Sequence, residues 1–510
     1  MNDNRVKRLV ILGGGTAGWM TAAALSKVIG PHACRIDLVE SDEIGTIGVG
    51  EATIPTIHWF NQLIGVQLGE FMRATQATYK LGIEFADWAR PGAVYLHPFG
   101  HYGLGSDSLP FHHRWIRARL EKATDDLAEY SLTTLAARAG KFAFPAQDTS
   151  SPLSTLGYAF HFDASLFARY LRTYSEARGV RRFEGKVVKI DQHAETGFIT
   201  CLHTDKGDRL EAELYVDCSG MAGILIERVL AAGFEDWSHW LPCNRALAVP
   251  CERAGAPIPY TRSTARTAGW QWRIPLQHRT GNGYVYCSQF ISDDEAASVL
   301  LGNLDGKALA EPRPIRFTPG RRKKAWSKNV VAVGLSAGFL EPLESTSIHL
   351  IQSAIAKLLS LFPTRDCDSC TVEQFNRVML QEYEGVRDFL VLHYHSTALK
   401  PEPLWQYCRS MPLPEGLKYK EEHFSRTGRI VIAPEEIFRD ASWLAVLVGQ
   451  GQMPTDYNPL LDTISSHDNR GYLRHVKDVL RSACARLPNH ESHLQGVIAG
   501  AHRELGKPSS

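Results

Sequence analysis

The chain has 510 residues, of which 44% are hydrophobic and 22% are charged, a composition typical of a water-soluble globular protein. This length is too great for one ordinary hydrophobic core, so we expect two or three lobes. The formal net charge of +1 argues against a nucleic acid or another polyanion as partner.

The first segment, "MNDNRVKRLVILGGG", passes directly into an apolar strand and has no hydrophobic region of a signal peptide. No apolar run is long enough to span a bilayer, so the sequence predicts a cytoplasmic protein with no membrane partner. The ten cysteines are scattered, with Cys367 and Cys370 as the one close pair, and we expect free thiols. No HExxH motif is present, and the sequence predicts no metal site.

Residues 6–30 are typical of a strand, a glycine turn and a helix. The glycines fit the GxGxxG pattern as Gly13, Gly15 and Gly18, which permit a tight turn, close approach to a pyrophosphate and close helix packing. A second apolar strand ends at Glu40, where a carboxylate can bind a ribose. The order of these features predicts a dinucleotide site, with an ordinary α/β glycine turn as the alternative.

The loop "GTIGVGEATIPTI" at 45–57 follows, and its glycines, among them Gly48 and Gly50, allow the backbone to approach a flat ligand. A flexible surface loop is the alternative. Residues 158–180 show the spacing of an amphipathic helix, and residues 185–193 and 197–207 are typical of hairpin strands.

Two further strands run into glycine turns, "LEAELYVDCSG" at 210–220 and "NVVAVGLSAGF" at 329–339. Three such turns spread over the first 340 residues favour one discontinuous FAD domain, because a compact NAD domain ends within roughly 150 residues. Between them, "GWQWRIP" at 269–275 places Trp270 and Trp272 on one face of a predicted strand. Two such indoles can wall off a cavity or can be ordinary core.

The spacing of apolar residues in 348–362 and 471–487 predicts helices. We therefore expect an α/β protein, with a discontinuous FAD-binding domain at 1–350 and a mainly helical lobe at 351–510.

Together these segments resemble the flavin-dependent halogenases of the tryptophan-halogenase family. The resemblance rests on the GxGxxG glycines and on "GVGEATIP" at 48–55, "YKLGIEF" at 79–85, the WxWxIP element and "GLSAGFLEPLESTSIHL" at 334–350, with a looser match at 442–454. It implies a Rossmann-like FAD domain of the flavin monooxygenase type. It also implies substrate-contacting insertions within 1–350 and a substrate pocket that the helical lobe at 351–510 completes.

The resemblance implies FADH2- and O2-dependent chlorination or bromination of an electron-rich aromatic of the indole type. In the family, a flavin C4a-hydroperoxide oxidises the halide to hypohalous acid, which reaches an active-site lysine. A separate flavin reductase delivers FADH2 by diffusion. The oligomeric state stays open, with a homodimer as one option. A flavin-dependent aromatic hydroxylase is the main alternative, and a flavin-binding redox sensor is a non-enzymatic one.

By position in the family motifs, Lys80 is the catalytic lysine and Glu344, rather than Glu341, is its partner. A lysine can hydrogen-bond hypohalous acid as an ammonium or form a haloamine, and the sequence leaves both open. The carboxylate can stabilise the cationic ring intermediate and accept its proton. Taken alone, Lys80 could be a surface lysine and Glu344 a helix-start acid. The halide is expected at Thr346 and Ser347.

Trp443-Leu444 stand where free-tryptophan halogenases carry adjacent tyrosines, which favours indole or a larger indolic compound over free tryptophan. The residues that the resemblance assigns to the substrate or tunnel are His97, Phe99, Trp270, Trp272, Ile274, Pro275 and Trp443. The residues that it assigns to FAD are Gly13, Gly15, Thr16, Ala17, Gly18, Glu40, Gly48, Gly50, Val187, Gly334 and Leu335.

Overall fold

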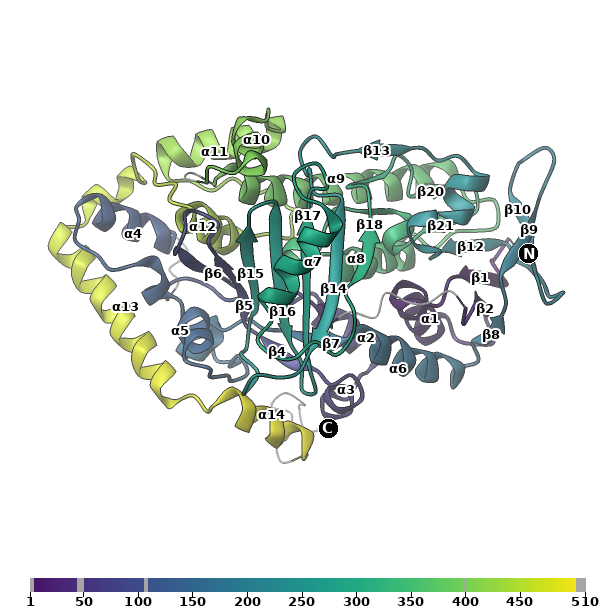
Figure 1. Cartoon of the computed structure of the whole chain (residues 1–510), viewed down its shortest axis with the longest axis horizontal. Helices are drawn as coiled ribbons and strands as arrows, with labels where there is room; N and C mark the ends of the chain where they lie inside the picture. The colour runs from purple at the N-terminus through teal and green to yellow at the C-terminus, as the bar shows by residue number, and fades with distance from the viewer. Residues whose placement is uncertain (1–3, 44–49, 105–108, 398–399, 501–510) are drawn as a thin grey trace. The chain divides into compact units, whose positions relative to one another are not determined.

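The computed structural model describes residues 4–43, 50–104, 109–397 and 400–500 (Figure 1). The chain forms two compact units, each assembled from three separate segments. The first unit comprises Met1–Gln67, Phe162–Ser238 and Arg316–Glu384, and the second unit comprises Leu68–His161, His239–Ile315 and Gly385–Ser510. These units do not divide at one point near residue 350. The assignment of 1–350 to flavin binding and of 351–510 to the substrate pocket stays a prediction.

A six-stranded sheet forms the centre of the first unit. Its order is β20-β21-β12-β1-β2-β8, and all neighbours are parallel except the edge pair β20–β21. The central strands are buried almost throughout, as expected for a parallel sheet covered on both faces. The strands are β1 (Arg8–Leu12), β2 (Arg35–Glu40), β8 (Arg181–Glu184), β12 (Leu214–Asp217), β20 (Trp326–Ser327) and β21 (Val330–Ala332).

Helix α1 (Thr16–Ile29) packs against α6 (Ala164–Glu176) and α8 (Ser347–Ser360), and Figure 1 shows α1 and α6 side by side. The small side chains of Ala22, Ala23 and Ala24 are fully buried, which allows this close packing. The remaining helices of this unit are α2 (Ile57–Ile64) and α9 (Ser369–His395), which continues past residue 384. Its smaller strands are β3 (Gly50–Ala52), β9 (Val187–Gln192), β10 (Ile199–Thr204), β11 (Arg209–Glu211), β13 (Phe234–Asp236), β19 (Gly320–Arg322) and β22 (Gly338–Phe339).

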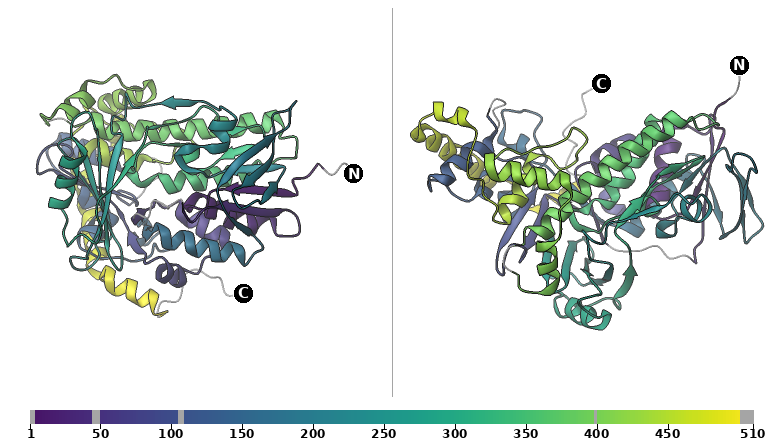
Figure 2. Two further views of the ribbon diagram at one scale, coloured as in Figure 1. Left: turned by 45° about the vertical axis from the view of Figure 1, so that its right-hand side comes forward. Right: turned by 90° about the horizontal axis from the view of Figure 1, so that it is seen from above.

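A seven-stranded sheet, β18-β14-β17-β16-β15-β5-β6, forms the core of the second unit, and Figure 2 shows its long strands from two further directions. Strands β14, β17, β16 and β15 are joined as antiparallel neighbours, while β15 and β5 are parallel. The strands are β5 (Gly82–Ala86), β6 (Val94–Pro98), β14 (Arg245–Cys251), β15 (Thr261–Arg266), β16 (Gly269–Pro275), β17 (Thr280–Tyr286) and β18 (Arg313–Arg316). A short strand β4 (Thr78–Lys80) pairs separately with β7 (Ala159–Asp163).

Helices make up most of the chain after residue 346, so the predicted α/β class with a helical C-terminal region is confirmed. The second unit contains α3 (Leu68–Ala74), α4 (Phe111–Leu120), α5 (Leu132–Arg138), α7 (Asp293–Gly302), α10 (Pro403–Ser410), α11 (Glu415–Thr427), α12 (Asp440–Gly449), α13 (Ser466–Arg486) and α14 (His490–Ile498).

Two local predictions have different outcomes. The hairpin expected at 185–207 is confirmed, because β9 and β10 pair in antiparallel fashion. The helix expected over 158–180 is wrong at its start, since β7 occupies Ala159–Asp163 and α6 begins only at Ala164. Asp163 ends the strand and caps the helix, with its carboxylate accepting from the N–H groups of Ser165 and Leu166.

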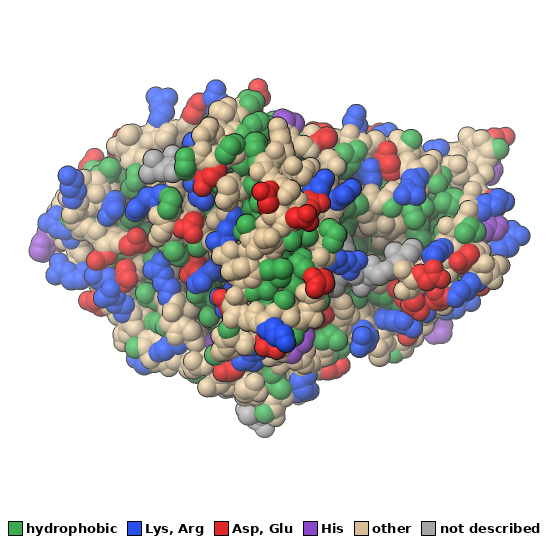
Figure 3. Space-filling model, viewed as in Figure 1, with side chains coloured by type: hydrophobic (Ala, Val, Ile, Leu, Met, Phe, Trp, Pro, Cys, Tyr) green, Lys and Arg blue, Asp and Glu red, His purple; other side chains and the backbone are tan. Residues whose placement is uncertain are grey.

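The surface in Figure 3 shows Lys and Arg side chains interspersed with Asp and Glu, in line with the net charge near zero. Within the described ranges, no helix combines the length and the apolar character needed to cross a lipid bilayer.

Candidate active site

The glycine loop between β1 and α1 is crowded by backbone. Gly13 has φ +109°, and a Cβ on it would lie 2.3 Å from the carbonyl oxygen of Cys218. A Cβ on Gly18 would lie 1.8 Å from the carbonyl oxygen of Gly13. Helix α1 begins at Thr16 after Gly15, with no side-chain cap and no acid in its first turn. Its first N–H groups and its positive dipole end therefore suit a phosphate.

Glu40, at the end of β2, lies directly over this loop. A Cβ on Gly14 would be 1.5 Å from Glu40 Oε2. The other oxygen, Oε1, accepts a hydrogen bond from Arg182 Nε at 2.6 Å. The structure thus places Glu40, the residue predicted to bind the ribose, beside the loop predicted to bind the phosphates.

The turn after β21 packs against the same helix start. Gly334 has φ +76°, and a Cβ there would lie 2.8 Å from the Cβ of Ala17. Leu335 follows it in a single 3-10 turn. Of the other predicted FAD residues, Gly50 begins β3, Val187 begins β9, and Gly48 lies outside the described residues.

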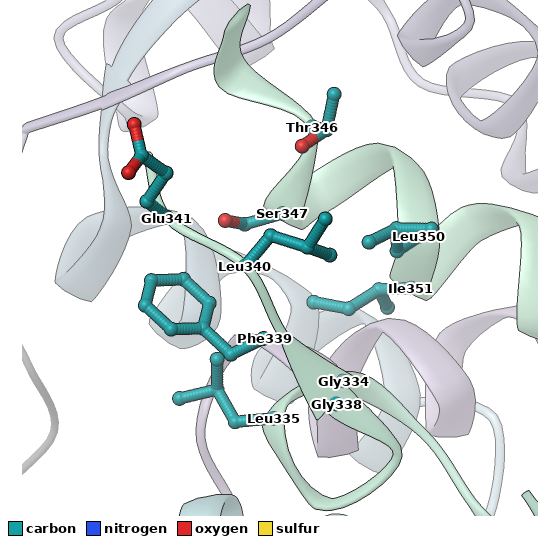
Figure 4. Close-up of a pocket in the computed structure, with 10 residues that line it drawn as sticks. All are labelled: Gly334, Leu335, Gly338, Phe339, Leu340, Glu341, Thr346, Ser347, Leu350 and Ile351. Atoms are coloured by element: carbon teal, nitrogen blue, oxygen red, sulfur yellow. The ribbon is translucent and has the colours of Figure 1, made fainter. Parts of the chain in front are cut away.

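A cavity in the first unit joins this turn to the start of α8 (Figure 4). It is lined by Gly334, Leu335, Gly338, Phe339, Leu340, Glu341, Thr346, Ser347, Leu350 and Ile351. A wider hollow of about 390 Å³ shares Leu335 and Phe339 with it. The segments "GLSAGFL" and "EPLESTS" therefore line the same cavity. In the sequence, only the family motifs indicated that they belong together.

The turn before α8 holds two residues in the left-handed region, Glu344 at φ +62° and Ser345 at φ +59°. Such a conformation costs roughly 1–2 kcal/mol per residue and is concentrated at functional sites. Glu344 is 1% exposed and does not line the cavity, whereas Glu341 does. Helix α8 starts at Ser347 with no side-chain cap and no acid in its first turn, so its N-terminus can accept an anion.

A buried polar network holds α8 in place. His349 Nδ1 is 2.9 Å from Thr56 Oγ1, and His349 Nε2 is 2.6 Å from Glu382 Oε1. Lys357 Nζ and Ser353 Oγ each lie 2.5 Å from Glu382 Oε2. Burial alone would raise the pKa of Glu382, but the hydrogen bond and charge of His349 and the Lys357 ammonium hold that pKa at about 2.

Lys80, at the end of β4 in the second unit, is fully buried rather than a surface lysine. Its Nζ lies 4.9 Å from the centre of the Phe99 ring, within the range of a cation–π contact.

Opposite Thr78 on the neighbouring strand β7 lies His161, and its hydrogen-bond partners determine its tautomer. The Thr78 hydroxyl donates to the carbonyl of Pro275 at 2.7 Å, so it accepts from His161 Nδ1–H at 3.0 Å. Burial and the Lys80 charge both lower the pKa of His161 well below the usual range, so the ring is neutral. With the proton on Nδ1, His161 Nε2 accepts from the Thr261 hydroxyl at 2.9 Å.

Aromatic side chains gather beside Lys80 and Phe99. His97 lies 6.1 Å from Phe99, 5.8 Å from Phe389 and 6.2 Å from Phe438, measured between ring centres. Phe389 in turn meets Trp443 at 5.2 Å. The structure thus brings the predicted residues His97, Phe99, Lys80 and Trp443 into one group, which we call the aromatic group together with Phe389 and Phe438.

The WxWxIP element forms β16, as predicted. Trp270 and Trp272 are 6.1 Å apart and both buried, and Trp270 contacts Trp88 at 6.4 Å. Ile274 is also buried, and the carbonyl of Pro275 holds the Thr78 hydroxyl two residues before Lys80. The element therefore supports the lysine strand as well as forming core.

Sequence reasoning missed four residues of this region: Thr78, His161, Phe389 and Phe438. Thr78 directly precedes the quoted "YKLGIEF", and its position two residues before Lys80 was a usable signal. Phe389 and Phe438 carried no local signal, because their neighbours lie far away in the sequence.

One group of potential metal ligands lies in the described part of the chain, on the β9–β10 hairpin: Asp191, Cys201 and His203. Asp191 already bonds His203 at 2.6 Å and Lys189 at 2.9 Å. A surface ion pair accounts for this group.

Comparison with known proteins gives a consistent result. A family model described as "Tryptophan halogenase" matches residues 8–466. Tryptophan 6-halogenase ThaL of Streptomyces albogriseolus is 36% identical over 501 residues, which are 90% of this chain and 92% of that protein. BrvH, a flavin-dependent halogenase from Brevundimonas sp. BAL3, superposes with a TM-score of 0.93 at 45% identity, covering 97% of this chain and 100% of that one. Xcc4156, a flavin-dependent halogenase from Xanthomonas campestris, has the same TM-score and identity, covering 96% of this chain and 98% of that one.

Proposed function

This chain belongs to the tryptophan halogenase family and is a flavin-dependent halogenase, and we propose that it halogenates a neutral indole-type compound in preference to free tryptophan. Bound reduced FAD supplies, with O2, the oxidising equivalent that makes chloride or bromide electrophilic. The loop Gly13–Gly18, Glu40 and the Gly334–Leu335 turn would hold the FAD. Their fit is supported by the crowded glycines and the uncapped start of α1.

Lys80 is proposed to hold the electrophilic halogen and direct it to the substrate ring. Its burial against Phe99 supports this role, because a lysine enclosed by aromatic side chains can hold a small polar ligand away from bulk water. Neutral His161 nearby adds no positive charge.

Glu344 is proposed to accept the ring proton, and Thr346 with Ser347 to hold the halide. The strained, buried turn at Glu344 and the uncapped start of α8 support these roles. In this proposal, Thr346 and Ser347 bind the halide and Glu344 accepts the proton, so one turn serves both steps.

The observation that carries the substrate proposal is that charged side chains near Trp443 and Phe389 pair with one another. Lys420 Nζ lies 4.5 Å over the Trp443 ring and is bonded to Glu436 at 2.5 Å. Arg387 is bonded to Asp388 at 2.8 Å. Because these side chains already form ion pairs, they do not supply free partners for the ammonium and carboxylate of an amino acid. An unpaired buried charge is very unfavourable, so a neutral substrate is favoured.

Competition between indole and tryptophan in one vessel, with FAD, a flavin reductase, NADH and bromide, tests the proposal. We expect kcat/KM for indole to exceed that for tryptophan by about tenfold or more, since each hydrogen bond missing to a charged group costs about 1.5–3 kcal/mol. A preference for tryptophan would contradict it. The bromine isotope doublet in the product mass separates halogenation from hydroxylation, which adds one oxygen.

A separate flavin reductase is proposed as the source of FADH2. We expect NADH alone to leave the absorbance of protein-bound FAD unchanged in stopped flow. Fast bleaching without a partner would contradict this. Action in the cytoplasm stays a prediction from the sequence.

A further inference from the structure

The strand that carries Lys80 is short and has an open edge. β4 comprises only Thr78–Lys80 and pairs on one side with β7, opposite residues 159–161. Tyr79 is fully buried, so its backbone N–H needs an acceptor that a further strand would normally supply.

A side chain from the C-terminal helix takes the place of that strand. The N–H of Tyr79 donates to His490 Nε2 at 3.3 Å, although the two residues are 411 positions apart. His490 Nδ1 lies 2.7 Å from the carbonyl oxygen of Pro257, which can only accept. His490 is therefore the neutral Nδ1–H tautomer, and burial lowers its pKa to about 4.

The segment 257–259 fixes the backbone on both sides of Lys80, directly at Leu81 and through His490 at Tyr79. Leu81 N–H donates to the carbonyl of Pro259 at 2.7 Å, and Pro257, two residues earlier, holds His490. Lys80 thus lies between two anchored peptide groups, one of them tied to α14.

The Tyr79 ring adds a second attachment to the same helix. It stacks on Phe142 with 3.9 Å between ring centres and lies 5.6 Å from His493. Because successive side chains of a strand point to opposite faces, Tyr79 faces this cluster while Lys80 projects to the other side. His490 therefore acts on Lys80 through the backbone and not by contact with its ammonium.

From this geometry we propose that His490 is a positioning residue for Lys80, so that the start of α14 sets where the lysine lies. The inference rests on the proposed role of Lys80. Displacement of a reacting group by about 1 Å can cost roughly 100-fold in rate, so loss of this anchor should be measurable.

The main variant is His490→Phe, which removes both hydrogen bonds and keeps a ring of similar size in the cluster. His490→Gln is the conservative variant, because its amide can accept from Tyr79 and donate to Pro257. His475→Phe, at an exposed histidine of α13, is the matched control. Should the Phe variant not fold, His490→Met takes its place.

Two readouts distinguish positioning from general destabilisation. In FAD-free protein, acetylation of Lys80 by acetic anhydride, followed by mass spectrometry, should rise about tenfold in His490→Phe and stay at the wild-type level in His490→Gln and His475→Phe. In the complete system, kcat for indole bromination should fall about 10- to 100-fold with KM unchanged, while oxidation of FADH2 continues.

Wild-type labelling of Lys80 together with wild-type kcat in His490→Phe would overturn the proposal. So would a loss of activity that His490→Gln fails to restore. A wild-type enzyme that brominates no indole would instead refute the proposed substrate, and the labelling result would still decide the place of Lys80.

Discussion

Replacing Glu382 by Gln is expected to lower the free energy of local opening of α8 by about 3 kcal/mol at pH 7. The bonds to His349 and Lys357 hold the pKa of Glu382 at about 2 in the folded protein, against an ordinary value of 4.5. This difference corresponds to about 3 kcal/mol, because each tenfold change in proton affinity is worth about 1.4 kcal/mol.

The sign of the pH dependence follows from the lowered pKa. The stabilisation is complete well above pH 4.5 and is lost as the pH falls toward 2, with about 1 kcal/mol gone at pH 4. Glu382→Gln should remove this part of the acid sensitivity, because its amide does not titrate.

Hydrogen exchange with mass spectrometry, on peptides covering 347–360 of FAD-free protein, measures the opening free energy directly. Glu373→Gln, at an exposed acid of the same helix α9, is the control and should match the wild type. An opening free energy for Glu382→Gln within about 0.5 kcal/mol of the wild type at pH 7 would refute the network's role.

Gly13→Ala should abolish FAD binding in a fluorescence titration, because the new Cβ would lie 2.3 Å from the carbonyl of Cys218 at φ +109°, while Gly471→Ala, with open space around it, should bind normally. Thr78→Val should destabilise the protein by about 2 kcal/mol in urea unfolding, because it leaves the buried His161 Nδ1–H and the Pro275 carbonyl without a partner. Unchanged FAD affinity in the first variant, or unchanged stability in the second, would contradict these assignments.

Only features encoded by local sequence motifs could be predicted from the sequence. The GxGxxG pattern predicted a tight turn, and Gly13 has φ +109°, but the carbonyl that crowds Gly13 belongs to Cys218, far away in the sequence. The helix expected from residue 158 shows the limit of periodicity. Residues 159–163 alternate as "AFHFD", which fits a strand, and Asp163 is a good helix cap, but the amphipathic pattern that follows obscured both signals.

Long-range partners could not be predicted. The acceptor for Tyr79 comes from a histidine 411 residues away, and Phe389 meets His97 across most of the chain. No local spacing encodes such contacts, because they depend on how separate segments pack. The same holds for the division into two interleaved units, which composition alone did not indicate.

Lys80→Met tests the central claim most directly, since methionine keeps much of the buried volume and removes the ammonium. With FAD, a flavin reductase, NADH, bromide and indole, mass spectrometry should find brominated product at less than about 1% of the wild-type amount, while FAD binding and FADH2 oxidation are unchanged. Bromination at the wild-type rate by this variant would show that Lys80 does not deliver the halogen.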